Sequence, residues 1–143
     1  MAKIVIIGAG AMGTAFALPC LDNNHDINIV GTHLENDFIE ELKNNNNLHP
    51  GLNTQIPQEI KIFKFEKFEE LLKSNVDLIV LGISSKGIEW VSDQLSKLYK
   101  DNAIPKLLML TKGLSIYNNQ YELLVDKLER LLAEGGIKKV DIS

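Results

Sequence analysis

Short, uninterrupted apolar runs recur along this chain and alternate with longer segments whose apolar residues have helical spacing. Continuous apolar runs are typical of strands that are covered on both faces, as in a parallel sheet. Strands that alternate with helices predict right-handed βαβ units, and therefore an α/β fold with a doubly wound parallel sheet in three α/β/α layers. The predicted strands are residues 4–7, 27–30, 78–81, 107–110 and 140–142.

The segments between these runs predict the helices and one long loop. A first helix is expected from Ala11, with a kink where Pro19 removes a backbone donor. The stretch 60–63 is compatible with a further strand. The polar segment 44–57 begins with four asparagines, and we interpret it as a low-complexity loop. Four further helices are expected around residues 38–42, 68–72, 88–98 and 121–132.

Composition restricts the partners of the chain. Its 143 residues have room for one domain, because domains cluster at about 100–150 residues. A net charge of −4 opposes nucleic-acid binding, which needs a basic surface.

Cys20 is the single cysteine, so no intramolecular disulfide can form and a cytoplasmic location is expected. His25 and His49 have no partner at metal-ligand spacing, so we expect two loop histidines and no metal site. The opening apolar run is too short for a signal peptide or a membrane span.

The strongest motif is the G-x-G-x-x-G pattern of Gly8, Gly10 and Gly13, directly after the first apolar run. The motif alone is weak, but its position between a strand and a helix is the one that dinucleotide binding requires. Gly8 allows a tight turn, Gly10 the close approach of a diphosphate, and Gly13 the packing of the helix on the strand. A glycine turn without a ligand is the less favoured alternative. We therefore expect a Rossmann-type fold that binds NAD(P).

The residues after the second run bear on the choice of cofactor. NAD sites usually place an acidic residue about 20 residues beyond the glycines, where it binds the ribose hydroxyls. Here Thr32 and His33 follow the strand and Glu35 comes late. The absence of a carboxylate at the strand end permits a 2′-phosphate, so we expect NADP slightly more than NAD. For His33, a cofactor contact and a solvated loop histidine stay equally open.

Further candidates follow two other predicted strands. Ligands of open α/β sheets bind at the carboxyl ends of the strands, where Ser84 and Lys112 are both expected to lie. Lys112 can offer a positive charge to an anionic substrate, although an ordinary surface lysine is the simpler alternative. Trp90 is expected to pack its helix against the sheet.

Four segments resemble a known family. Residues 4–15 (IVIIGAGAMGTA), 48–51 (LHPG), 77–84 (DLIVLGIS) and 111–114 (TKGL) are similar to the amino-terminal half of NAD(P)-dependent glycerol-3-phosphate dehydrogenase. The likeness covers essentially the whole chain. It implies that Ala11 and Met12 contact the dinucleotide along with the glycines, and that Thr32 and His33 lie at the adenosine ribose. It also implies that Lys112 lies between the nicotinamide and the substrate.

The resemblance implies a reaction in glycerophospholipid metabolism. Hydride would move between the nicotinamide and the second carbon of dihydroxyacetone phosphate or sn-glycerol 3-phosphate, small phosphorylated molecules. The family continues beyond the strand near Val140 into a helical substrate domain, which carries the lysine that acts as general acid/base. We therefore expect residues 1–143 to be the cofactor-binding domain without that substrate domain, and to bind dinucleotide with little or no turnover.

Some properties stay open at this point. The family often has arginine where Thr32 and His33 stand, which leaves the choice between NAD and NADP undecided. A homodimer is compatible with the sequence. Another reductase of the same plan, of the 3-hydroxyacid or ketopantoate type, is an alternative that the Thr-Lys-Gly sequence disfavours. A stand-alone NAD(P)-binding sensor that acts through a partner is the alternative outside the enzymes.

Overall fold

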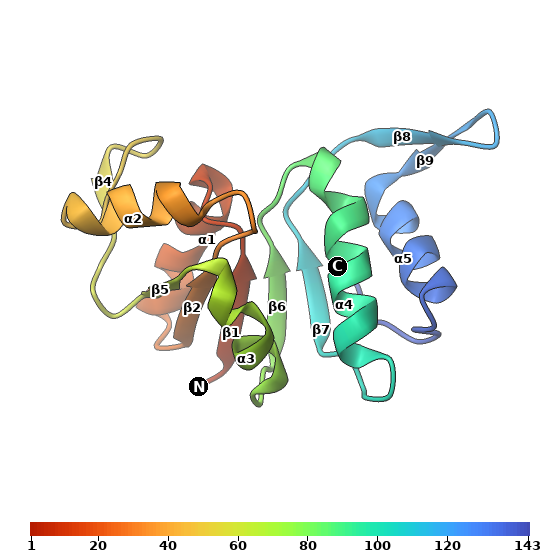
Figure 1. Cartoon of the computed structure of the whole chain (residues 1–143), viewed down its shortest axis with the longest axis horizontal. Helices are drawn as coiled ribbons and strands as arrows, with labels where there is room; N and C mark the ends of the chain where they lie inside the picture. Colours follow the sequence, from red (N-terminus) through yellow and green to blue (C-terminus); the bar gives the residue numbers. More distant parts are fainter.

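The central feature of the fold is one parallel five-stranded sheet. The computed structural model describes residues 1–143, and its strands have the order β5-β2-β1-β6-β7. All neighbouring strands pair in parallel, and Figure 1 shows β1, β6 and β7 pointing upward. The chain first builds outward from β1 and then returns to its other side, so the strand order reverses between β1 and β6. The strands are β1 (Lys3–Ile7), β2 (Asp26–Val30), β5 (Lys61–Phe63), β6 (Leu78–Leu81) and β7 (Lys106–Met109).

Helices cover both faces of this sheet. Because successive side chains of a strand point to opposite faces, Ile4 and Ile6 enter one core, with α1 and α2, while Val5 and Ile7 enter the other. The second core is closed by α3, α4 and α5, and α5 lies beside α4 (Figure 1). The helices are α1 (Ala11–Asp22), α2 (Asn36–Asn44), α3 (Phe68–Lys73), α4 (Ile88–Tyr99) and α5 (Leu124–Glu134).

The predicted fold class is confirmed, and so is the additional strand near residue 60, which pairs in parallel with β2. The strand expected at 140–142 is wrong in extent. There the chain forms a single parallel bridge from Ile142 to Leu107, with the Leu107 amide donating to the carbonyl oxygen of Asp141 at 2.9 Å. The kink expected at Pro19 does not end α1. The helix continues to Asp22, and Pro19 lies exposed on its outer side.

The helix expected over 121–132 begins only at Leu124. Residues before it form an antiparallel hairpin of β8 (Leu114–Tyr117) and β9 (Gln120–Leu123). Asn118 and Asn119 connect these strands with φ angles of 51° and 62°, the left-handed values of a type I′ turn. The segment 44–57 is likewise not a plain loop, since it contains a second small hairpin of β3 (Leu48–His49) and β4 (Thr54–Gln55).

Asparagine occupies the left-handed backbone positions outside glycine. Its short polar side chain tolerates this conformation better than other side chains do. In the asparagine run, Asn46 and Asn47 turn the chain from the end of α2 into β3, so the run forms a turn with defined geometry. The six positive-φ residues other than glycine are Asn24, Asn46, Asn47, Asn53, Asn118 and Asn119.

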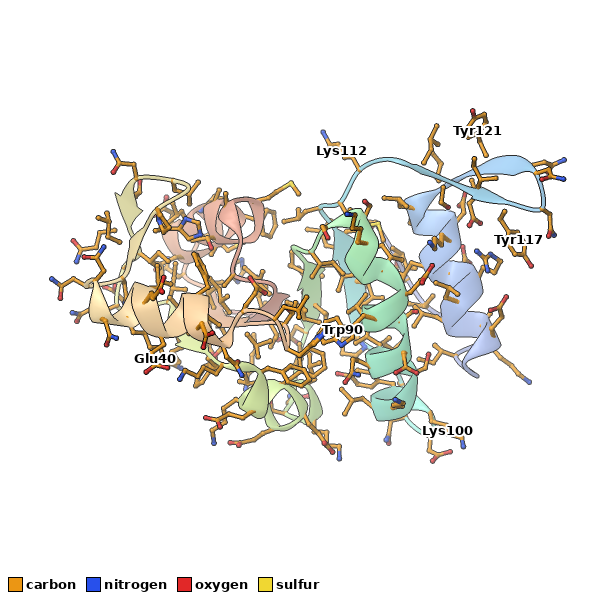
Figure 2. All side chains as sticks on the ribbon, turned by 45° about the horizontal axis from the view of Figure 1, so that its top comes forward. Glu40, Trp90, Lys100, Lys112, Tyr117 and Tyr121 are labelled. Atoms are coloured by element: carbon orange, nitrogen blue, oxygen red, sulfur yellow. The ribbon has the colours of Figure 1, made fainter.

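One side of the β8–β9 hairpin is fixed to α5 by Arg130. Its Nη2 donates to Oε1 of Glu122 at 2.7 Å, its Nε to Oε2 at 3.3 Å, and the guanidinium lies 3.7 Å from the ring centre of Tyr117. Figure 2 shows Tyr117 and Tyr121 on opposite sides of the hairpin. On the side of Tyr121, Ile116 and its neighbours are exposed. No helix of the fold is long and apolar enough to cross a membrane.

Candidate functional site

Three glycines bring the ends of β1 and β6 against the start of α1. Gly8 leaves β1 with a φ of +106°, and a Cβ on it would lie 2.3 Å from the carbonyl oxygen of Gly82. A Cβ on Gly13 would lie 3.0 Å from the oxygen of Gly8, and one on Gly82 would lie 2.8 Å from the Cα of Gly13. Side chains are therefore excluded here by backbone contact, as expected for Gly8 and Gly13.

The start of α1 presents free backbone donors to open space. A Cβ on Gly10 would meet no atom within 4 Å. The first amide of this helix to find a partner is that of Thr14, which donates to the oxygen of Gly10 at 3.1 Å. The preceding amides, including those of the exposed Ala11 and Met12, have no acceptor in the chain, and no acidic residue stands in the first helical turn. Free amides at the positive end of a helix form an anion site.

A crevice of about 430 Å³ adjoins this helix end. It lies between the loop that follows β2 and the segment that follows β6, next to the point where the strand order reverses. Ligands of open α/β sheets bind at such a point. The crevice brings together four residues singled out from the sequence, namely Gly10, Thr32, His33 and Ser84.

Trp90 forms an aromatic wall of the crevice as well as packing α4 on the core. Its ring centre lies 4.9 Å from that of His33 and 5.7 Å from that of Phe65. Sequence reasoning anticipated the packing of Trp90 and not its place in the crevice. Such a flat surface suits the stacking of a planar base.

The structure corrects the inference that no carboxylate stands at the end of the second strand. A tight turn, in which the Glu35 amide donates to the oxygen of Thr32 at 3.0 Å, folds Glu35 back toward β2. Its carboxylate accepts from the amides of Thr32 and Ala9, each at 2.9 Å. The Thr-x-x-Glu spacing was the available signal, because in this motif the Glu side chain reaches back to the amide of the Thr.

His49 was also missed, since it was expected in an open loop. It lies in β3 and is only 2% exposed. Its Nδ1 accepts from the amides of Gly51 and Leu52, at 3.1 and 3.3 Å. Nε2 therefore carries the hydrogen, which it donates to the carbonyl oxygen of Ala9 at 2.9 Å. No sequence motif indicates this contact, because His49 and Ala9 are 40 residues apart in the chain.

Lys112 lies at the same edge of the sheet but outside the crevice. It lines a separate hollow with Thr111 and Leu124, and its side chain is exposed. Figure 2 shows it directed outward at the top of the molecule, whereas Trp90 lies near the centre. Thr111 ties this segment to the crevice, because its Oγ1 donates to the oxygen of Ile83 at 2.5 Å. The predicted contacts of Lys112 with nicotinamide and substrate stay predictions.

A parallel sheet with this strand order, a glycine turn after β1 and free amides beside a crevice together define a dinucleotide-binding domain of the Rossmann type. Comparison with known proteins narrows this class. The chain belongs to the family described as NAD-dependent glycerol-3-phosphate dehydrogenase N-terminus, whose sequence model matches residues 3–140.

Individual relatives agree with this assignment. The chain is 30% identical over 116 residues to the NADP(+)-dependent glycerol-3-phosphate dehydrogenase of Archaeoglobus fulgidus, covering 81% of this chain and 33% of that protein. It is 33% identical over 135 residues to the glycerol-3-phosphate dehydrogenase [NAD(P)+] of Fusobacterium nucleatum, covering 94% and 38%. The chain thus spans little more than a third of the length of these relatives.

A solved structure agrees on the fold. The crystal structure of glycerol-3-phosphate dehydrogenase from Coxiella burnetii superposes with a TM-score of 0.73 at 23% sequence identity, over 99% of this chain and 39% of that one. At this identity the superposition supports the Rossmann-type architecture alone.

Proposed function

We propose that this chain binds NAD(P) as the cofactor-binding part of an NAD(P)-dependent glycerol-3-phosphate dehydrogenase. The complete protein would interconvert dihydroxyacetone phosphate and sn-glycerol 3-phosphate by hydride transfer. The observation that carries the proposal is the group of free amides at the start of α1, which faces open space at Gly10 in a chain of this family.

The residues present fit the cofactor. The amides of Ala11 and Met12 would hold the diphosphate, since a helix start without a side-chain cap or an acidic neighbour favours an anion. Thr32, His33 and Ser84 would contact the adenosine half in the crevice. When bound, the nicotinamide supplies the hydride chemistry, while the protein provides position and charge.

The proposal about the substrate is supported by the names of the relatives and by one residue of this chain, Lys112. The names of the relatives support a small phosphorylated substrate. Lys112, with its exposed ammonium group at the carboxyl edge of the sheet, would stabilise the polarised oxygen or the phosphate of that substrate. The general acid/base would come from outside residues 1–143. We therefore expect the 143-residue protein to bind dinucleotide without reducing dihydroxyacetone phosphate, and measurable turnover would contradict this.

The binding proposal can be tested with the single tryptophan of the chain. Because Trp90 lies in the crevice, NADH bound there should quench its fluorescence by energy transfer, and titration gives the dissociation constant. In Gly10→Val the new side chain would occupy the space open to the diphosphate. We expect NADH affinity to fall at least about tenfold, since a lost anion contact of about 1.4 kcal/mol has that effect.

The control for this variant is Ala15→Val, which adds a similar volume to the same helix on an exposed side. It should leave NADH affinity within about twofold of the wild type. Thermal unfolding of both variants reports whether the fold is intact. The proposal is wrong if wild-type protein does not bind NADH, or if folded Gly10→Val binds it as tightly as wild type does.

A further inference from the structure

The peptide groups around Ala9, between the first two glycines of the loop, are held by side chains from two other loops. On one side, the amide of Ala9 donates to Oε2 of Glu35 at 2.9 Å. On the other, its carbonyl oxygen accepts from Nε2 of His49 at 2.9 Å. Ala9 is itself buried, its contact with His49 is buried, and its contact with Glu35 is partly buried at the edge of the crevice. The conformation of the glycine loop therefore depends on one charged and one uncharged partner.

We propose that Glu35 is a specificity-determining residue, whose fixed carboxylate at the crevice makes this chain select NAD over NADP. The proposal rests on dinucleotide binding in the crevice and goes beyond it by naming the residue that chooses the cofactor. It reverses the slight expectation of NADP, because that expectation assumed that no carboxylate lies at the end of β2.

The argument begins with the acceptor capacity of the carboxylate. Each of its oxygens accepts one amide hydrogen, from Ala9 or from Thr32, and each retains room for another donor. The ribose of NAD offers two hydroxyl donors of this kind. The ribose of NADP carries a 2′-phosphate instead, which is doubly charged for the most part at pH 7 and has few hydrogens to donate. Glu35 therefore attracts the first ribose and repels the second.

The cation of the crevice is less able to decide the choice. Lys86 also lines the crevice, but its side chain is exposed, so its field is screened by solvent and salt. Glu35 is half-buried, and two hydrogen bonds prevent it from turning away. A 2′-phosphate would have to approach this fixed charge or break both bonds.

His49 provides the matched comparison for this argument. It holds the other side of Ala9 but contributes no charge, because its Nδ1 accepts two amide hydrogens in the neutral form. Loss of His49 should therefore disturb the glycine loop for both cofactors in the same proportion. Loss of the Glu35 charge should separate them.

The experiment is the ratio of the dissociation constants of NADPH and NADH, measured by Trp90 quenching. We expect wild-type protein to prefer NADH by about tenfold or more, and Glu35→Gln to lower the ratio by about tenfold. Because glutamine has one acceptor oxygen, one of the two amide contacts is also lost, which should weaken both nucleotides by a common factor and leave the ratio as the measure of the charge. Glu41→Gln removes the same charge from an exposed site on α2 and should not change the ratio. His49→Phe should weaken both nucleotides by one common factor.

Three outcomes would overturn the proposal. The first is a wild-type protein that binds NADPH more tightly than NADH, which needs no variant and so does not depend on the folding of Glu35→Gln. The second is a Glu35→Gln ratio within about twofold of the Glu41→Gln ratio. The third is a change in the ratio in His49→Phe as large as that in Glu35→Gln. Failure of both nucleotides to bind wild type would instead contradict the proposed function.

Discussion

Gly8 and Gly82 are in direct backbone contact, so close that a Cβ on Gly8 would lie 2.3 Å from the carbonyl oxygen of Gly82. This contact joins the carboxyl ends of β1 and β6 at the floor of the crevice. It also depends on Gly13, whose Cα would lie 2.8 Å from a Cβ on Gly82. The position of the free amides of α1 is thus set by backbone packing from two strands.

Gly82→Ala should therefore destabilise the fold. The new methyl group meets backbone atoms that cannot turn aside, and overpacking of this kind costs about 1–3 kcal/mol in the free energy of unfolding. Urea denaturation followed by far-UV circular dichroism measures the change. Gly10→Ala, whose methyl group meets nothing within 4 Å, is the matched control and should change stability much less. Equal effects of the two substitutions would contradict the conclusion that backbone packing around Gly82 excludes a side chain.

Pro19→Ala should stabilise the protein. Pro19 lies inside α1 on the exposed side, where it lacks the amide that would donate to the carbonyl of Ala15. Alanine supplies that donor without disturbing the core, and we expect a gain of about 1–3 kcal/mol. The gain should appear as a higher urea midpoint with an unchanged slope. A lower midpoint would mean that α1 needs the proline ring.

Alkaline pH should weaken the fold through Tyr99. Burial raises the pKa of its phenol to about 12, and the hydroxyl donates to the carbonyl oxygen of Leu72 at 2.6 Å. The folded pKa lies above the unfolded one, so this stability is complete below pH 10 and is lost as pH rises toward 12. The loss approaches 2–3 kcal/mol, or about 1.4 kcal/mol for each unit of pKa.

Tyr99→Phe separates this effect from the titration of lysines over the same pH range. The variant should be less stable by about 1 kcal/mol at pH 7, because the Leu72 oxygen loses its partner. Its stability should then fall less steeply than that of wild type between pH 10 and 12. Parallel curves for the two proteins would show that Tyr99 is not the group responsible.

Arg130→Lys should loosen the β8–β9 hairpin. Lysine cannot reproduce the paired hydrogen bonds to Glu122 or the stacking on Tyr117. Hydrogen exchange of the hairpin amides should accelerate roughly tenfold, while exchange in β1 and β6 stays unchanged. Lys97→Arg, at an exposed pair with Asp93 on α4, is the control. Acceleration throughout the sheet would contradict a local role for Arg130.

Acid should have the same effect on the hairpin. The hydrogen bond from Arg130 lowers the pKa of the Glu122 carboxyl below its usual value. This contribution is therefore present at neutral pH and is lost as the pH falls through the lowered pKa. Exchange rates corrected for intrinsic chemistry should rise in the hairpin under acid, and they should do so less in Arg130→Lys.

Much of the sheet could be predicted because its strands are buried on both faces. That burial makes β1 and β6 continuous apolar runs, and the glycine motif marks the turn that follows β1. The segment 114–132 could not be assigned in the same way. Its apolar residues satisfy helical spacing through Tyr121, and the hairpin depends on the backbone of Asn118 and Asn119. The spacing of apolar residues alone does not distinguish a helix from this hairpin.

The same contrast between local and long-range contacts applies to the site. The glycine loop is local in sequence, so its geometry could be inferred from three glycines and their neighbours. The partners of Ala9 lie 26 and 40 residues further along the chain, and no local sequence pattern indicates contacts between residues so far apart in sequence. Only the fold brings Glu35 and His49 to the two peptide groups that flank Ala9.

The use of asparagine at each left-handed position outside glycine has a chemical consequence. The backbone nitrogen after an asparagine can attack the side-chain amide carbonyl and expel ammonia, and water then opens the cyclic imide to an acidic residue. Asparagine is therefore a thermolabile residue. Prolonged warming below the unfolding temperature should therefore deamidate this protein first at its turns, while the sheet stays intact. Isoelectric focusing should show this as species that each carry one more negative charge.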